Sequence, residues 1–351
     1  MNDGKPPRIV HLPGGIRAVD DLSPKIKLYH SPSEILGEYP RPDYAKLYGT
    51  LNGLGLFPGG VEFVRPEAMQ GLSPPDWECS SPRGGFLVRQ ERRAWGDIRH
   101  AARVDALAEV VNAAAHCLTY LDLLSLRLWQ LSTAYNQMLV SAYRPGDDER
   151  LLVSTGYMRH IDAAVHAFVA DAGSFRDLLA EMSWRFILGG QERVTTLGSF
   201  IKKAKNNADP LAVEIIAAAS DKCWLRQLSS LRDETVHVAP MGRQQNFHSC
   251  KIRSKALSPT VTVQLLHYPI LQADGTIWSD DGDVDFEDEE AVKTAISQYN
   301  DFVEDSQDGL IYCWQTLDRL VDLLSRIRGR SGFRAEMLKI TDDDIIDFKP
   351  R

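Results

Sequence analysis

Residues 97–139, "DIRHAARVDALAEVVNAAAHCLTYLDLLSLRLWQLSTAYNQML", contain neither glycine nor proline, and their apolar residues recur at helical spacing. This pattern predicts a long amphipathic helix. Such a helix is stable only when its apolar stripe packs against other elements, and helices are the usual partners. The stretch therefore constrains this part of the chain to a helical bundle.

Further helices are expected downstream of this stretch. One covers about 155–188, a short one lies in "TLGSFIKKAKN", and a third runs from "ADPLAVE" to about residue 236. Asp209 is placed as the N-cap of the third helix, with Pro210 at its first position. The last helix begins in the acidic "DFEDEEAV" and ends at "LLSRIRGRSG", a charge order that suits the helix dipole.

Residues 1–95 have a different character, because they hold 12 of the 18 prolines and 12 of the 25 glycines. Prolines and glycines at this density exclude long helices. The aromatic residues in this part are too numerous for a disordered tail. The sequence predicts an irregular N-terminal arm, with short strands at most, laid over the remainder or over a partner.

Residues 245–280 alternate polar and apolar positions, as in "TVTVQLLHYPILQADGTIWS". Asp274-Gly275 is a strong turn signal, and Pro269 would place its strand at a sheet edge. The fold class expected is therefore mainly α, a helical bundle over residues 96–330 with a small antiparallel β insertion at 245–280. Residues 331–351 form a C-terminal tail.

Composition excludes several classes of protein. The net charge of −8 does not draw the whole molecule to nucleic acid or to acidic membranes, so any RNA site must be a local basic patch. The five cysteines form no Cys-x-x-Cys, which argues against a zinc site and fits a reducing cytoplasm. With no signal peptide and no run of 18 apolar residues, we expect a cytoplasmic protein without a membrane contact.

The segment "LSSLRDETVHVAP", residues 228–240, places an arginine on an apolar stripe. The stripe of the third helix continues through Leu225 and Leu228 to Arg232, and His237 follows just before Pro240. A guanidinium on such a stripe is costly unless it is paired or faces an interface or a cleft. On an ideal helix, positions five apart diverge by about 140°. Arg232 and His237 can converge only if the last turn loosens or if they meet across a dimer.

"LRDETVH" resembles the R-x4-H motif of the HEPN family, whose domains are helical bundles with Arg and His near the end of one helix. Asp233 stands where that family often has Asn. The resemblance covers residues 97–329 and implies a HEPN-like bundle acting as a homodimer. It also implies a composite cleft lined by Arg232 and His237 of both protomers. Cleavage of RNA there would leave 2',3'-cyclic phosphate and 5'-hydroxyl ends.

These residue types suit metal-independent RNA cleavage. Histidine, with a pKa near 6.5, can move a proton from the 2'-hydroxyl or to the leaving oxygen at neutral pH. Arginine, permanently charged and planar, can stabilise the phosphorane. The alternative is a helix end stabilised by cations, with the histidine bonded to a carbonyl and no chemistry. A second match to the motif, Arg243 to His248, lies in a polar loop with no helical stripe behind it.

Other residues are candidates for supporting roles. Asp162 and His166, at i,i+4 on the second helix, could orient the active site, although an ordinary surface pair is the plainer interpretation. The positive charge for RNA binding would come from Lys202, Lys203, Lys205, Arg226 and Arg243. A solvated helix face explains the three lysines equally well.

No cofactor or metal is expected, because the acidic "SDDGDVDFEDEE" lacks the calcium-loop spacing and no dinucleotide or Walker motif is present. The first hypothesis is a cytoplasmic HEPN-type endoribonuclease used as a toxin or in defence, with RNA as substrate and a neutralising protein as a candidate partner. The second is a non-catalytic scaffold or sensor of the same fold that dimerises through the motif helix. The overall acidity favours the second hypothesis, and the placement of Arg232 and His237 favours the first.

Overall fold

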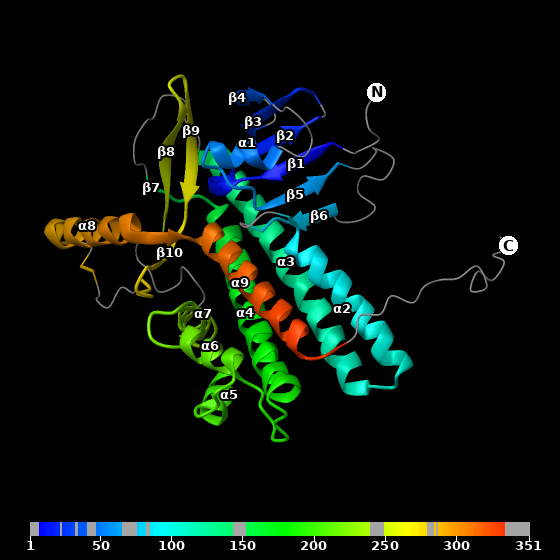
Figure 1. Cartoon of the computed structure of the whole chain (residues 1–351). Coiled ribbons are helices and arrows are strands. Elements are labelled where there is room, and N and C mark those ends of the chain that lie inside the picture. Colours follow the sequence, from blue (N-terminus) through cyan, green and yellow to red (C-terminus); the bar gives the residue numbers. More distant parts are fainter. Residues whose placement is uncertain are drawn as a thin grey trace, which may run out of the picture.

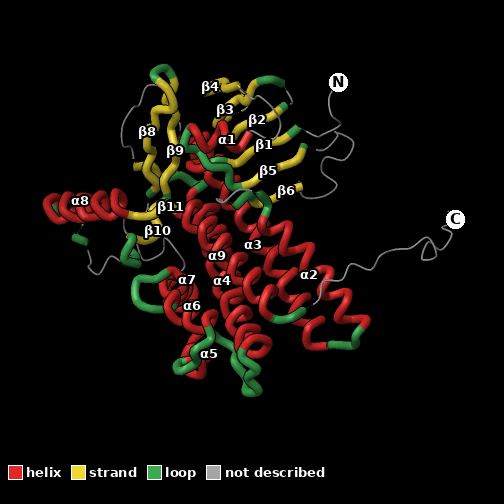
Figure 2. Tube along the Cα trace, viewed as in Figure 1, coloured by secondary structure: helices red, strands yellow, loops and turns green. Residues whose placement is uncertain are grey.

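A computed structural model describes residues 7–21, 23–31, 34–40, 47–64, 76–81, 85–142, 152–238, 249–278, 284–285 and 287–333. The protein is a mixed α/β structure in which an N-terminal sheet lies over one end of a bundle of long helices, as Figure 1 and Figure 2 show. The expectation of a mainly α chain is therefore correct for the bundle and too narrow for the whole.

The N-terminal region has the short strands expected and lies over the bundle, but it is not irregular, because these strands form a six-stranded antiparallel sheet in the order β4-β3-β2-β1-β5-β6. Helix α1 (Leu47–Gly53) lies between the fourth and fifth strands. The strands are β1 (Arg8–His11), β2 (Arg17–Asp20), β3 (Lys25–Ser31), β4 (Glu34–Pro40), β5 (Gly60–Phe63) and β6 (Asp76–Cys79).

Short strands explain the error. A strand of four residues needs a turn at each end, so the prolines and glycines that exclude helices delimit strands here. The chain passes from β1 to β2 through the 3-10 turn Pro13–Gly15, whose Gly14 has φ 66° and Gly15 φ 88°. A Cβ on Gly14 would overlap the backbone of Leu265, and one on Gly15 would overlap that of Tyr135. Only glycine fits this close approach.

Two long helices replace the single one expected over residues 97–139. Helix α2 (Leu87–Val104) ends at a break, and α3 (Ala108–Ala142) begins four residues later. Ala106 in the break has φ 56°, a left-handed conformation that glycine normally supplies. No glycine or proline therefore marks this break in the sequence. Helices α4 (Met158–Met182) and α9 (Gly309–Arg330) complete the bundle.

The helix expected from 210 to 236 is also two helices, α6 (Pro210–Ala218) and α7 (Trp224–Asp233), separated by a turn in which Lys222 has φ 62°. The start was predicted correctly, since the Asp209 carboxylate accepts hydrogen bonds from the backbone N–H groups of Leu211 and Ala212. The expected short helix is α5 (Leu197–Ala204). A π-helical turn, Glu234–Val238, follows α7 directly.

The β insertion is confirmed and extended. Strand β8 (Cys250–Ser258) pairs with β9 (Val261–His267) and with the short β7 (Leu152–Val153). Strand β10 (Pro269–Gln272) pairs with β11 (Ser306–Asp308), which divides the expected last helix into α8 (Glu289–Asp305) and α9. Figure 1 shows α8 projecting from the body beside this pair of strands.

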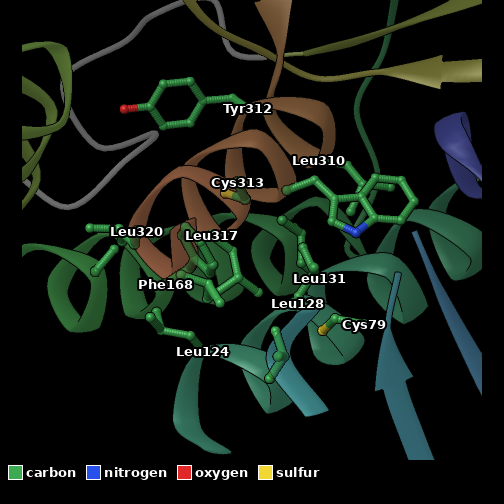
Figure 3. Close-up of a cluster of buried hydrophobic side chains, with 14 of the residues drawn as sticks. Cys79, Leu124, Leu128, Leu131, Phe168, Leu310, Tyr312, Cys313, Leu317 and Leu320 are labelled. Carbon is green, nitrogen blue, oxygen red and sulfur yellow. The ribbon is translucent and has the colours of Figure 1, made fainter. Parts of the chain in front are cut away.

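One hydrophobic core runs through the sheet and the bundle, so residues 1–95 are not an appendage. Figure 3 shows its centre, where α9 packs against α3, α4 and the end of β6. The labelled side chains are Cys79, Leu124, Leu128, Leu131, Phe168, Leu310, Tyr312, Cys313, Leu317 and Leu320.

Candidate functional site

Arg232 lies in the last turn of α7, where that helix packs along α4. Arg176 Nη1 donates a hydrogen bond to Ser229 Oγ at 2.6 Å, which ties the two helices together. One turn further, the aliphatic stem of Arg232 crosses Gly173 so closely that a Cβ on Gly173 would overlap the Arg232 Cδ. The absence of a side chain at this position of α4 thus leaves the space that the stem of Arg232 fills.

The guanidinium of Arg232 has no acidic partner among the residues that the structure describes. The residue is half-buried, Asp233 next to it is exposed, and Glu234 begins the π turn. Thr235, which is buried, donates its hydroxyl hydrogen to the Arg232 carbonyl oxygen at 3.2 Å and fixes the local backbone. The cation is therefore held by its stem, and its charge is compensated by no described carboxylate.

The π turn changes the relation between positions 232 and 237. In a π turn the backbone hydrogen bonds link residues five apart, so the backbone is wound more loosely than in an α-helix. The condition that the last turn must loosen is thus met by the backbone of Glu234–Val238. The side chain of His237, together with Pro240 and Arg243, lies outside the described part of the structure.

The face of α4 that carries Gly173 also carries His166, seven residues or two turns earlier. His166 is half-buried, and its Nδ1 is buried without a hydrogen-bond partner among the described residues. Because α7 and α4 run antiparallel here, as the 176–229 and 173–232 contacts show, the π turn lies along α4 on the side toward His166. His166 therefore lies on the same face as the motif.

Asp162, one turn before His166, accepts a hydrogen bond from the Tyr268 hydroxyl at 3.0 Å. This bond attaches α4 to the chain just after β9. Asp162 therefore helps to anchor the β insertion on the bundle, a contact that its helical spacing from His166 does not reveal.

The basic residues expected to bind RNA are not gathered around Arg232. Helix α5 docks lower on α4, where the Leu197 N–H donates to Asp177. Lys202 and Lys205 are exposed there, whereas Lys203 pairs with Glu192 and lies over the Trp184 ring. Figure 1 shows α5 below α6 and α7. Arg226 is exposed on α7 itself and is the described basic residue nearest in sequence to the motif.

Sequence reasoning missed a buried chain of polar groups between the sheet and α3. His11 Nδ1 lies 3.1 Å from Ser132 Oγ, and His11 Nε2 lies 2.9 Å from Glu62 Oε2. Arg17 donates to the Ser132 hydroxyl and carbonyl oxygens. The order Ser-His-Glu matches a hydrolase relay, but His11 is 1% and Ser132 3% exposed, so no substrate reaches the hydroxyl. No spacing in the sequence could have joined residues 11, 62 and 132.

No family model, no curated protein and no solved structure matches this chain. Within the described residues, no three His, Cys, Asp or Glu side chains gather in a way that could hold a metal ion. In the same residues, no helix has both the length and the apolar character needed to cross a membrane.

Proposed function

We propose that the protein is a metal-independent endoribonuclease of the HEPN type, with Arg232 and His237 as its catalytic residues. The observation that carries the proposal is the π turn Glu234–Val238, because it loosens the backbone between position 237 and an arginine whose charge no described carboxylate compensates. π turns of this kind occur frequently at functional sites. A purely structural helix end requires neither feature.

In the proposed reaction the 2'-oxygen of the RNA attacks the neighbouring phosphorus, and the bond from phosphorus to the 5'-oxygen breaks. His237 takes the proton from the 2'-hydroxyl or supplies one to the leaving 5'-oxygen. Arg232 stabilises the charge on the phosphorane oxygens. His166, whose Nδ1 is buried on the same face of α4 and has no hydrogen-bond partner among the described residues, is a positioning residue for this cleft. The products are a 2',3'-cyclic phosphate and a 5'-hydroxyl end.

The proposal extends to the setting of the reaction. A homodimer would bring two copies of the motif to one cleft, and Val236, 43% exposed inside the π turn, provides an apolar contact for that seam. Arg226, Lys202 and Lys205 supply exposed positive charge on the α5–α7 side of the molecule. A role as a toxin or in defence would require a neutralising partner for the same cleft.

Purified protein is expected to cleave mixed RNA in the presence of EDTA and to leave 5'-hydroxyl ends. Arg232→Ala and His237→Ala should each lower the rate at least about a hundredfold, since each removes a group that acts in the transition state. The measurement is gel analysis of cleaved RNA, with phosphorylation of new 5' ends by a kinase to identify them. Arg103→Ala, at an exposed position of α2 that has no part in the proposed cleft, is the matched control and should change the rate by less than about threefold. Absence of cleavage in the native protein contradicts the proposal.

Gly173→Ala is expected to lower the cleavage rate about tenfold without removing a catalytic group, because the new methyl displaces the stem of Arg232. The protein should remain folded, since the displaced atoms belong to a flexible side chain with a half-buried head. Circular dichroism checks the fold, and the same RNA assay checks the rate. Gly198→Ala on α5, where a Cβ has space, is the control. An unchanged rate in Gly173→Ala would show that the position of Arg232 is irrelevant to the reaction.

The second candidate is a non-catalytic scaffold of similar fold that dimerises through the motif helix. The exposed Val236 and the net charge of −8 favour it. It predicts dimers in light scattering that dissociate when Val236 is replaced by Asp, together with RNA that stays intact under every condition. Cleavage that depends on His237 rejects it.

A further inference from the structure

A groove of about 380 Å³ lies between α3 and α4, away from the motif. Ala167 lines the groove, whereas Gly173, six residues later, faces Arg232. Six residues on an ideal helix amount to a rotation of about 120° from the starting direction. The groove and the proposed catalytic cleft therefore lie on different flanks of α4, and what binds in the groove is independent of the proposed nuclease activity.

The shape of the groove suits a flat ring. Ala134, Ala163, Ala164 and Ala167 supply only methyl groups to it, so that the two helices leave open space between their larger side chains. Trp129 from α3 and the exposed His160 from α4 also line it and offer aromatic faces. Its volume is near the lower end of the roughly 300–1,000 Å³ typical of small-molecule pockets. A ligand of one or two fused rings fits this description, and a dinucleotide does not.

The polar groups of the groove are neutral and available. Arg127, the one arginine or lysine among the described residues that line the groove, is bound to Asp171 at 3.1 Å and donates to the Gln130 side-chain oxygen at 3.1 Å. With its oxygen engaged, Gln130 keeps its amide N–H groups for a ligand. Thr133 and Gln137 line the groove and make no side-chain hydrogen bond to any described residue. The groove thus has uncommitted amide and hydroxyl groups and no uncompensated positive charge.

We propose that this groove binds an uncharged nucleoside through its base. Aromatic faces stack on bases, and amide side chains bond the donor and acceptor edge of a base. The pairing of Arg127 with Asp171 leaves no cation for a phosphate, so the groove selects the nucleoside over its nucleotide. The ligand class follows from the neutral polar walls combined with the aromatic and methyl lining.

Calorimetric titration of the full chain with adenosine, guanosine, cytidine and uridine tests the proposal. At least one of the four is expected to bind with one site per chain. Gln137→Ala should weaken that binding by about two- to tenfold, the effect of one lost hydrogen bond. Ala163→Leu, which fills the groove from an exposed position, should weaken it at least about tenfold. The 5'-monophosphate of the same nucleoside should bind no more tightly than the nucleoside.

Ala217→Leu, at an exposed position of α6, is the matched control and should leave the affinity unchanged. The proposal is overturned if none of the four nucleosides binds at millimolar concentration, or if Ala163→Leu and Gln137→Ala both bind as the native protein does. If the 5'-monophosphate binds more than tenfold more tightly than its nucleoside, the proposal that the ligand is uncharged is overturned. Because Arg232 and His237 take no part, these results are distinct from failure of the RNA cleavage assay.

Discussion

Lowering the pH from 7 to 4 is expected to cost the protein about 4 kcal/mol of unfolding free energy, chiefly through two buried histidines. Burial, reinforced by the nearby Arg17, lowers the pKa of His11 to about 3, even though its contact with Glu62 acts in the other direction. Burial and Arg253 lower the pKa of His267 to about 3 as well. In the unfolded chain both imidazoles titrate near 6.5.

The direction of the effect follows from the folded pKa values lying below the unfolded ones. Above pH 6.5 both histidines are neutral in either state, and their contribution to stability is complete. As the pH falls toward 3, only the unfolded chain takes up protons, so stability is lost by about 3 kcal/mol per histidine at pH 4.

Asp308 acts in the opposite direction, because burial raises the pKa of its carboxyl to about 6. The carboxyl accepts hydrogen bonds from the Tyr135 hydroxyl and from the Tyr268 and Ile311 N–H groups, and these bonds limit the rise. Its folded pKa exceeds the unfolded one, so it stabilises the folded chain increasingly as the pH falls through 6. At pH 4 the raised pKa of Asp308 adds about 2 kcal/mol to the unfolding free energy, which leaves the net loss near 4 kcal/mol.

Thermal unfolding followed by circular dichroism at pH 7, 6, 5 and 4 measures this loss, which should lower the midpoint by about 5 °C. His11→Gln should be less stable at pH 7 and should lose about 3 kcal/mol less than the native protein between pH 7 and pH 4. His116→Gln, at an exposed position of α3, should follow the native profile. Equal pH dependence in His11→Gln and the native protein would show that the buried imidazole does not control acid stability.

The long helices could be predicted because their signal is local. Periodic apolar residues and the Asp209 cap with Pro210 place the end of α3, the helix α4 and the start of α6 within a few residues of their observed positions. The breaks could not be predicted, because Ala106 and Lys222 adopt left-handed conformations that their residue types disfavour. Tertiary contacts set such backbone angles, and no window of sequence contains them.

The N-terminal sheet was missed because its pairing is not local. Strand β1 pairs with β2 through a short turn, but also with β5, about fifty residues away. A proline- and glycine-rich segment can be a loop or a set of turns between strands, and only the partner strands decide between them. Arg8 and Asp20 are buried and pair at 2.8 Å across β1 and β2. From the sequence alone, both would be interpreted as surface charges.

The residues proposed for the candidate site stand out in the sequence, whereas their surroundings do not. The apolar stripe that leads to Arg232 is visible in the sequence, as is Pro240, before which a helix is expected to end. Gly173, which makes room for Arg232, lies inside a helix, where a glycine usually signals nothing more than a small loss of stability. The π turn has no compositional signal at all. The positive charge assigned to a single RNA-binding surface is divided between α5 and α7 in the structure.

Gly59→Ala is expected to destabilise the protein by more than about 4 kcal/mol, or to prevent folding, because the added methyl would lie inside the indole ring of Trp314. Trp314 is 3% exposed on α9 and donates its indole N–H to the Gly59 carbonyl oxygen, so it has no free space into which to turn. Chemical denaturation measures the loss. Gly53→Ala in α1, where a Cβ meets nothing within 4 Å, is the matched control and should change stability by less than about 1 kcal/mol.

The same substitution tests whether the sheet and the bundle unfold as one unit. Gly59 belongs to the N-terminal layer and Trp314 to the bundle, so a clash between them should weaken both parts together in a single transition. Replacing Trp314 with Leu first should reduce the cost of Gly59→Ala, since the ring that causes the clash is gone. If Gly59→Ala instead left the unfolding of the helices unchanged, residues 1–95 would be the loosely attached arm that their composition suggests. The shared core requires the opposite result, because α9 cannot keep Trp314 buried once the strand start that covers it has moved away.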